Sequence, residues 1–343
     1  MASELSTATE KRKRPLTAWE LGSLLMPMHQ YRRPRRTQGK ERSHFLPILA
    51  FIYRNRYVLA NQVQQRFSNI LKSDRTARRH LGEMESLGYL NTVVTQSVGP
   101  LWPKVYHVTM RGAARLRKAL VSKGKPGHII RLDRSRTAGY SADHVVHEIW
   151  TTQFLLDVWQ SVQTSDGLEI LKMERRSVAA NAAFRVSVHG RMIRLIPDAM
   201  FLYRQAGKGM MCCFVEIDTG TMSLKQIAAK FERYDAFVMS SAGKGYLTEL
   251  YRQHGAAEPK VAFRLATVVS DRSSRQGERR RLSRLMRLAS RYRVGARAWF
   301  VTSTTLAERA LDLATSGRIR GLRNCPTASC EGSEVACVNA DLF

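Results

Sequence analysis

Two apolar segments that follow each other closely constrain the fold of this chain most. They read RLIPDAMFLY at residues 194–203 and CCFVEIDTGT at residues 212–221. Short apolar runs rich in branched and aromatic residues predict β-strands. Each run nevertheless contains acid, with Asp198 in the first and Glu216 and Asp218 in the second. A chain of this kind must therefore accommodate three carboxylates on two apolar strands.

Alternation along the strands predicts that these carboxylates meet. Side chains two apart in a strand share a face, so Glu216 and Asp218 point to one side. Val215 and Ile217 point to the other side, into apolar packing. Asp198 lies at the equivalent depth of the preceding strand. Pairing of the two strands would bring all three acids together.

Converging carboxylates need a positive partner, because they repel one another and burial raises their pKa values. Mg²⁺ binds through one or two carboxylates together with water and phosphate oxygens. It can polarise a phosphodiester and activate water as a nucleophile. The alternative is that the acids pair with arginine, and Arg194 and Arg204 are near in sequence. Both interpretations stay open on the residues alone.

The charge balance points to a polyanionic partner. The 343 residues include 56 Lys and Arg against 28 Asp and Glu, a net charge of +28. Such a surface suits nucleic acid, and an acidic membrane surface is the alternative. No apolar run reaches the roughly 20 residues that span a bilayer. The basic run KRKRP at 11–15 is not followed by the apolar stretch of a signal peptide. We therefore expect a cytoplasmic protein with no membrane partner.

The five cysteines agree with a reducing compartment. Cys212 and Cys213 lie inside a predicted strand and are expected to be reduced core residues. Cys325, Cys330 and Cys337 have spacings that match no zinc motif, so we expect three thiols and no metal there.

Composition divides the chain into segments. Residues 1–42 form a basic arm, whose like charges predict disorder and neutralisation of phosphates. Residues 122–139 are rich in Gly, Pro, Ser and Lys and predict a linker. The remaining segments are two domains, at 43–121 and 140–318, and a tail at 319–343.

The domain at 43–121 carries three helical segments and then two β-like runs. HFLPILAFIYRNRY and LANQVQQRF predict two helices, and SDRTARRHLGEMESLGYL predicts a third, with Ser73 as its N-cap and Gly88 as its stop. The runs NTVVTQ and KVYHVT follow as strands. This order, with the passage from LGYL to YHVTMRGAARL, resembles the bacterial winged helix-turn-helix fold. Members of that fold place the third helix in the major groove of DNA.

The third helix of this segment carries the residues expected to contact DNA. Its apolar stripe runs from Ala77 to Leu87. Four basic residues are expected on the side away from that stripe, facing the groove: Arg75, Arg78, Arg79 and His80. The alternative is a solvated basic face of the kind that many helices have.

The domain at 140–318 has an α/β pattern. ADHVVHEIWTTQFLLDVWQSV, SLKQIAAKFERYDAFV and RRRLSRLMRLASRYR predict helices. LEILKMERRS, RMIRLIPDAMFLYR, MMCCFVEIDT, KVAFRLATVVS and ARAWFVTS predict strands. The last helix has an apolar face and a basic stripe that suits a DNA backbone. The stripe consists of Arg280, Arg284, Arg287 and Arg291.

A second resemblance concerns the acidic strands themselves. The pair Pro-Asp that ends at Asp198, the EID that begins about 17 residues later, and the following helix with Lys and Tyr resemble the PD-(D/E)XK nuclease pattern. Together with the upstream helices, PDAMF…FVEIDTGTMSLKQIAAKFERY resembles the plasmid replication-relaxation family over about residues 43–305. The resemblance implies a fold class: α/β, with an N-terminal winged helix-turn-helix followed by a restriction-endonuclease-like domain with a central mixed sheet. A related group of conjugative relaxases shares this architecture and nicks DNA at a transfer origin.

The resemblance also implies roles for single residues. Asp198 matches the motif aspartate and Glu216 the motif acid. Asp218 stands where the motif lysine is usual, and the family's acid-x-Asp pattern implies that it is a third metal ligand. Lys230 on the following helix could supply the missing ammonium, with Tyr234 one turn further on the same face.

Two further points of the site stay open. Lys225 is the alternative to Lys230 as the lysine of the site. His147 and Glu148 lie where nucleases of this fold often place an accessory acid or polar group, and the plain alternative is a polar pair with a structural role.

Two functions compete at this point. The first is a nickase of a plasmid or mobile element that binds duplex DNA at a replication or transfer origin, uses Mg²⁺ or Mn²⁺, and is compatible with a homodimer. The second is a non-catalytic replication initiator or transcriptional regulator that uses the nuclease-like domain as a scaffold. The three acids favour the enzyme, and the missing motif lysine favours the scaffold. RNA binding is a third class, but the chain lacks the aromatic stacking motif expected for it.

Overall fold

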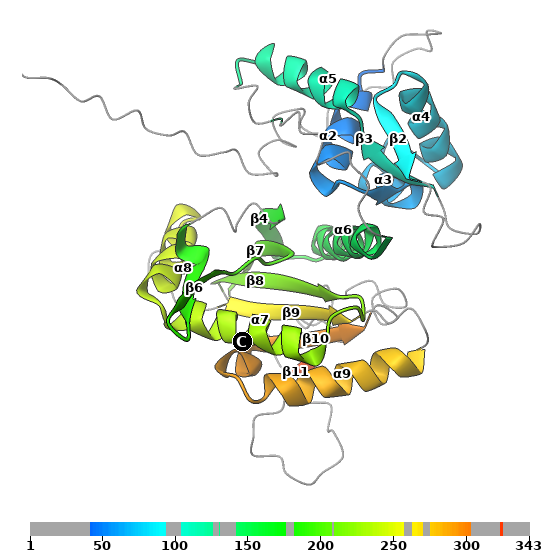
Figure 1. The fold of residues 1–343 in the computed structure, drawn as a ribbon. Helices are drawn as coiled ribbons and strands as arrows, with labels where there is room; N and C mark the ends of the chain where they lie inside the picture. Colours follow the sequence, from blue (N-terminus) through cyan, green and yellow to red (C-terminus); the bar gives the residue numbers. More distant parts are fainter. Residues whose placement is uncertain are drawn as a thin grey trace, which may run out of the picture.

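A computed structural model provides the fold (Figure 1). It describes residues 42–93, 104–125, 130, 142–175, 182–207, 209–256, 263–269, 275–302 and 323–324. The predicted basic arm up to residue 41, most of the predicted linker and the tip of the predicted wing lie outside these residues. So does the predicted tail with its three cysteines, except for residues 323–324, which form a strand. The described chain is mixed α/β, as predicted.

The first part of the chain contains three helices followed by an antiparallel strand pair, in the predicted order. Its elements are α2 (Phe45–Asn55), β1 (Val58–Leu59), α3 (Ala60–Arg66), α4 (Asp74–Ser86), β2 (Leu90–Val93), β3 (Val105–Val108) and α5 (Met110–Val121). The three strands form a small sheet in the order β1-β3-β2, and all its pairs are antiparallel. The two-residue β1 was not predicted.

The ends of α4 agree with the sequence. The Ser73 hydroxyl accepts a hydrogen bond from the backbone N–H of Thr76, which satisfies a free donor of the first turn. Gly88 follows the helix with φ +71°, a conformation that glycine adopts at little cost. Apolar residues on the inner face, including Ala77, Leu81 and Met84, pack into a core shared by α2, α3 and α5. These confirmed caps fix which side of α4 faces solvent.

The second part is built on one mixed sheet with the strand order β11-β10-β9-β8-β7-β4. Its strands are β4 (Leu168–Arg175), β7 (Ala199–Gln205), β8 (Gly209–Asp218), β9 (Phe263–Val269), β10 (Ala298–Thr302) and β11 (Arg323–Asn324). The pairs β8–β9 and β9–β10 are parallel, and β4–β7 and β7–β8 are antiparallel. A separate antiparallel hairpin consists of β5 (Arg185–Val188) and β6 (Arg191–Arg194).

Helices cover both faces of this sheet (Figure 1). They are α6 (Ala142–Gln163), α7 (Leu224–Met239), α8 (Ser241–Gln253) and α9 (Arg275–Ala289), with short 3-10 segments at Ala182–Phe184 and Arg293–Arg297. Cys213, Val215 and Ile217 of β8 pack with residues of α6. Cys212 and Phe214 pack on the opposite face with residues of α7, α8 and α9. Strand alternation therefore operates as predicted, and both cysteines are buried and free.

One predicted strand is divided in the structure. The run RMIRLIPDAMFLYR forms two strands, β6 and β7, with residues 195–198 between them. Pro197 has no N–H to donate and cannot continue a ladder in the middle of a sheet. The first half consequently pairs with β5, a strand that was not predicted, and only the second half enters the main sheet. Helix α8 was also not predicted.

In the part of the chain that the structure describes, no helix is both long enough and apolar enough to cross a membrane.

Candidate functional site

The register of the sheet brings Asp198 and Glu216 together. Ala199, the first residue of β7, pairs with Val215 of β8, so one step further along the antiparallel pair Asp198 lies opposite Glu216. The backbone N–H of Asp198 donates to the carbonyl of Val215 over 3.0 Å. Its Oδ2 accepts a hydrogen bond from the backbone N–H of Ile217 over 2.9 Å. The turn at Pro197 thus fixes the first acid against the strand that carries the second.

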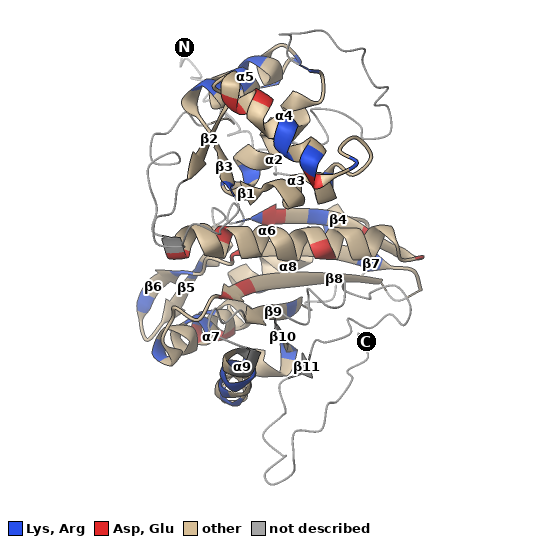
Figure 2. Ribbon diagram, turned by 90° about the vertical axis from the view of Figure 1, so that its right-hand side faces the viewer, with Lys and Arg blue, Asp and Glu red and all other residues tan. Residues whose placement is uncertain are grey.

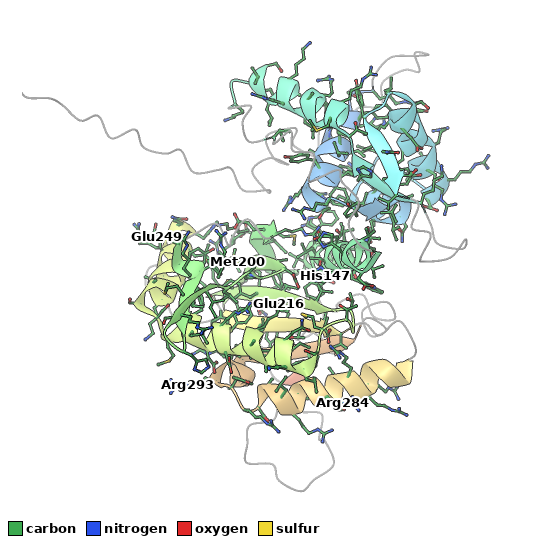
Figure 3. The ribbon with its side chains drawn as sticks, viewed as in Figure 1. His147, Met200, Glu216, Glu249, Arg284 and Arg293 are labelled. Atoms are coloured by element: carbon green, nitrogen blue, oxygen red, sulfur yellow. The ribbon has the colours of Figure 1, made fainter. Side chains whose placement is uncertain are left out.

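Side chains from two helices meet these carboxylates. Lys230 of α7 donates from Nζ to Glu216 Oε2 and lies 4.0 Å from Asp198 Oδ2. Tyr234, one turn along, donates its hydroxyl to Glu216 Oε1 over 2.8 Å. His147 of α6 places Nε2 3.1 Å from Asp198 Oδ2. We call these five residues the acid cluster, and Figure 3 labels two of them, His147 and Glu216.

Burial gives the two carboxylates different proton affinities. Burial raises the pKa of Glu216 to about 7, against the opposing charge of Lys230 and with a contribution from Asp198. Burial also acts to raise the pKa of Asp198, but the charges of Lys230 and His147 outweigh it and hold that pKa well below its ordinary value. For Lys230, burial acts to lower the pKa, but Glu216 and Asp198 outweigh it and raise that pKa. The pKa of Glu216 therefore lies near neutral pH, whereas the pKa of Asp198 lies far below it.

Asp218 has a different partner. It shares a face of β8 with Glu216, as predicted, but Arg281 of α9 approaches it with Nε 2.6 Å from Oδ2 and Nη2 3.0 Å from Oδ1. The backbone N–H of Gly220 donates to Oδ1 over 3.1 Å. The same Nη2 donates to the carbonyl of Met222. The structure therefore brings Asp198, Glu216 and Lys230 together and places Asp218 in a neighbouring arginine pair.

Among the described residues, no three His, Cys, Asp or Glu side chains are grouped so as to hold a metal ion. Two carboxylates nevertheless lie side by side, and both oxygens of one of them, Glu216, accept hydrogen bonds from Lys230 and Tyr234. Oδ2 of Asp198 is occupied by hydrogen bonds, whereas no described residue donates one to its Oδ1. Magnesium needs only one or two protein carboxylates when water and phosphate complete its shell. Asp198 and Glu216 fit that requirement as a donor pair.

Of the remaining predicted site residues, some contact the three acids and others do not. Lys225 is exposed on the first turn of α7, and the contact with the acids belongs to Lys230. Arg204 pairs with Glu169 over 3.1 Å and does not neutralise the three acids. His147 contacts Asp198, but its neighbour Glu148 accepts from Arg175 Nη2 over 2.6 Å and belongs to another cluster.

The predicted basic face of α4 is present, with one correction. Arg75, Arg78 and Arg79 are exposed, and Arg78 pairs with Asp74 on the same helix. Figure 2 shows basic positions in blue along α4. His80 is buried, and its Nδ1 lies 2.6 Å from Nε2 of His44. The expectation that His80 lies away from the apolar stripe is wrong. It follows Ala77 by three residues, and positions three apart share a helix face.

The basic stripe of α9 is also present. Arg280, Arg284, Arg287 and Arg291 are all exposed. Figure 3 shows Arg284 pointing away from the sheet. The buried face of the helix contains Leu282, Leu285, Met286 and Ala289, as predicted.

Arg281 was not predicted, because the sequence pattern of α9 pointed only to the basic stripe of Arg280, Arg284, Arg287 and Arg291. A positional signal existed. Arg281 precedes the buried Leu285 by four residues, so it lies at the edge of the apolar face and can point inward. What the helix pattern could not supply was its target, because Asp218 is 63 residues away in the sequence.

Comparison with known proteins gives one match. The family model described as Replication-relaxation matches residues 49–255. The matched range includes α4 and all five residues of the acid cluster, and it ends before α9. No curated protein and no solved structure matches the chain.

Proposed function

Because the chain belongs to the replication-relaxation family, we propose that it is a plasmid replication-associated DNA-binding protein that nicks DNA at a replication or transfer origin. The observation that carries the catalytic part is the acid cluster. Two carboxylates lie side by side at the end of the β7–β8 pair, with a lysine ammonium against both. This arrangement supports a restriction-endonuclease-like site in which Lys230 supplies the ammonium from the following helix.

Each residue of the cluster has a distinct task in this proposal. Asp198 and Glu216 would hold Mg²⁺ or Mn²⁺, which polarises a phosphodiester and lowers the pKa of a bound water. Lys230 would stabilise the negative charge that develops on the phosphate. Tyr234 holds Glu216, and His147 holds Asp198, through the contacts already described. Asp218 could join the donors only if Arg281 released it.

DNA binding is assigned to the first part of the chain. Three helices followed by an antiparallel strand pair support a winged helix-turn-helix, in which α4 enters the major groove. The exposed Arg75, Arg78 and Arg79 are then available to bases and phosphates. Arg284 and Arg287 on α9 would contact the backbone of the same duplex. A basic surface would thereby deliver a polyanion to an acidic site.

The catalytic assignment is tested by nicking of the supercoiled plasmid that encodes the protein. We expect relaxation with Mg²⁺ or Mn²⁺ and none with a chelator. Asp198→Asn and Glu216→Gln should abolish nicking and leave DNA affinity nearly unchanged, because they remove charge without changing shape. Glu169→Gln is the matched control, since Glu169 is an exposed carboxylate on β4. Residual nicking by both site variants would show that Asp198 and Glu216 are not catalytic residues.

The binding assignment is tested by gel shift at moderate salt. Arg78→Ala combined with Arg79→Ala should weaken binding by about 1–3 kcal/mol per base-reading arginine, and by less if the two contact phosphate alone. The control is Arg117→Ala with Lys118→Ala, an exposed pair on α5 that removes the same charge. Equal affinities of the two double variants would refute the role of α4.

A specific observation favours a second candidate function. The bidentate contact of Arg281 with Asp218 neutralises one of the three acids, as expected of a scaffold that binds DNA without cutting it. This function is a replication initiator or transcriptional regulator. It predicts tight, salt-dependent binding to the origin and no nicking with any divalent metal.

A further inference from the structure

The β5–β6 hairpin lies outside the main sheet and leads directly into Asp198. Within it, Val186 pairs with Ile193 and Arg185 pairs with Arg194. Val186 is buried in the core that includes α7. Because side chains alternate along a strand, Arg185 and Arg194 lie on the face turned away from that core.

The hairpin concentrates positive charge on its outer face. Arg185 and Arg194 are exposed and lie directly opposite each other across the antiparallel pair. Arg185 and Arg191 are exposed, and no described carboxylate forms an ion pair with either. Glu232 of α7 lies 3.8 Å from His189 at the turn, so it faces the histidine. The charges of Arg185 and Arg191 are therefore available to an anion.

The position and the apolar content of the hairpin suit DNA. Met192 pairs with Ser187 on the same outer face and is 67 % exposed. A large apolar side chain among arginines can contact deoxyribose while the guanidinium groups contact phosphate. Arg194 precedes Asp198 by four residues, a span of at most about 14 Å in an extended chain. Figure 2 shows the basic residues of β5 and β6 on a part of the molecule separate from α4.

We propose that the β5–β6 hairpin is a second DNA-contacting element, which grips the duplex backbone beside the acid cluster through Arg185 and Arg194 on its outer face and the exposed Arg191 beside its turn. This inference rests on the proposed function, because it assumes that duplex DNA is the ligand. It adds a contact surface that precedes the site in the chain and is separate from α4 and α9. The hairpin would hold the phosphates that flank the scissile one.

The test measures affinity for origin duplex DNA by fluorescence anisotropy, with the full chain in metal-free buffer over a series of salt concentrations. The variant is Arg185→Gln with Arg191→Gln. Loss of two phosphate contacts should make the slope of log K against log salt shallower by about 1.8 and weaken binding by about 10-fold at moderate salt. Thermal unfolding should occur at an unchanged temperature, because both substituted side chains are exposed.

Arg117→Gln with Lys118→Gln removes the same charge from α5 and serves as the control. A hairpin variant that loses no more affinity and no more slope than this control would overturn the inference, while wild-type binding would leave the proposed function intact. Failure of the wild-type chain to bind duplex DNA at any salt concentration would overturn the proposed function, and the inference with it. A larger loss in the hairpin variant, at unchanged thermal stability, supports the inference.

Discussion

His147 and Glu148 are neighbours on α6, but they belong to two polar clusters of opposite character. His147 belongs to the acid cluster. Glu148 belongs to what we call the closed cluster, in which Arg175 of β4 donates to Glu148, to Thr152 and to the side chain and carbonyl of Asn55. The closed cluster joins the second part of the chain to the end of α2 in the first part.

The difference between the clusters is one of chemistry. Arginine stays charged, and its planar group can satisfy several acceptors at once, so Arg175 holds the closed cluster together with a fixed charge. Lysine in the acid cluster contacts two carboxylates with a single point charge, and one of them, Glu216, has a pKa of about 7. The closed cluster therefore uses buried charge for a structural contact. The acid cluster contains a buried carboxylate, Glu216, that can titrate near neutral pH.

The largest expected effect comes from breaking the closed cluster. Arg175→Met should reduce the free energy of unfolding by about 3–5 kcal/mol, because Glu148 remains as a buried charge without its arginine. Chemical denaturation followed by circular dichroism measures this loss. Arg175→Lys is the matched variant. It keeps the charge but not the fork, and an intermediate loss is expected. A change below about 1 kcal/mol for Arg175→Met would show that this cluster does not hold the two parts together.

A smaller loss of stability is expected from Lys230→Met. Asp198 would keep the contacts of His147 and Ile217, and Glu216 would keep Tyr234 and could take up a proton. We expect a cost of about 1–3 kcal/mol at pH 8, between that of a typical mutation and that of a broken buried pair. The cost should shrink at pH 6, where protonation of Glu216 replaces the lost ammonium.

The nicking activity of the same variant tests whether the acid cluster, unlike the closed cluster, is catalytic. Lys230→Met should abolish nicking at both pH values, whereas Lys225→Met, an exposed lysine on the same helix, should leave it unchanged. Stability that falls equally at pH 6 and pH 8 would contradict the titration of Glu216.

The contrast also marks how far the sequence could predict the structure. Local patterns predicted the caps of α4 and the alternation along β8, because both depend on spacing within one element. The contact of Lys230 with Glu216 was suggested by the family resemblance, which left Lys225 open as the alternative. The division of the strand at Pro197 could have been predicted from the missing N–H of proline. The pairing of its first half with β5 could not have been predicted, because β5 is only four residues long and its alternating pattern is too short to recognise.

The arginine partners were beyond the reach of the sequence. Arg281 meets Asp218, and Arg175 meets Asn55, across 63 and 120 residues respectively. With 56 Lys and Arg in the chain, composition gives no means to choose among the cations. The burial of His80, by contrast, could have been predicted from its buried neighbours at helical spacing. Its polar ring nevertheless suggested a surface position.

The smallest and most specific effect is expected from Tyr234→Phe. The tyrosine hydroxyl lowers the pKa of Glu216 by donating to its carboxylate, so its removal should raise that pKa above about 7. Nicking requires ionised Glu216 in our proposal, so the increase of the nicking rate with pH should shift to higher pH.

The free energy of unfolding changes with pH in the opposite direction. The folded pKa of Glu216 lies above its ordinary value of 4.5, so its contribution is complete below about 4.5 and is lost as the pH rises through about 7. Nicking rates and unfolding midpoints between pH 5 and pH 9 measure both trends, with Tyr246→Phe, whose hydroxyl faces Met200, as the control. A profile that does not move in Tyr234→Phe would mean that a group other than Glu216 sets the pH dependence of the site.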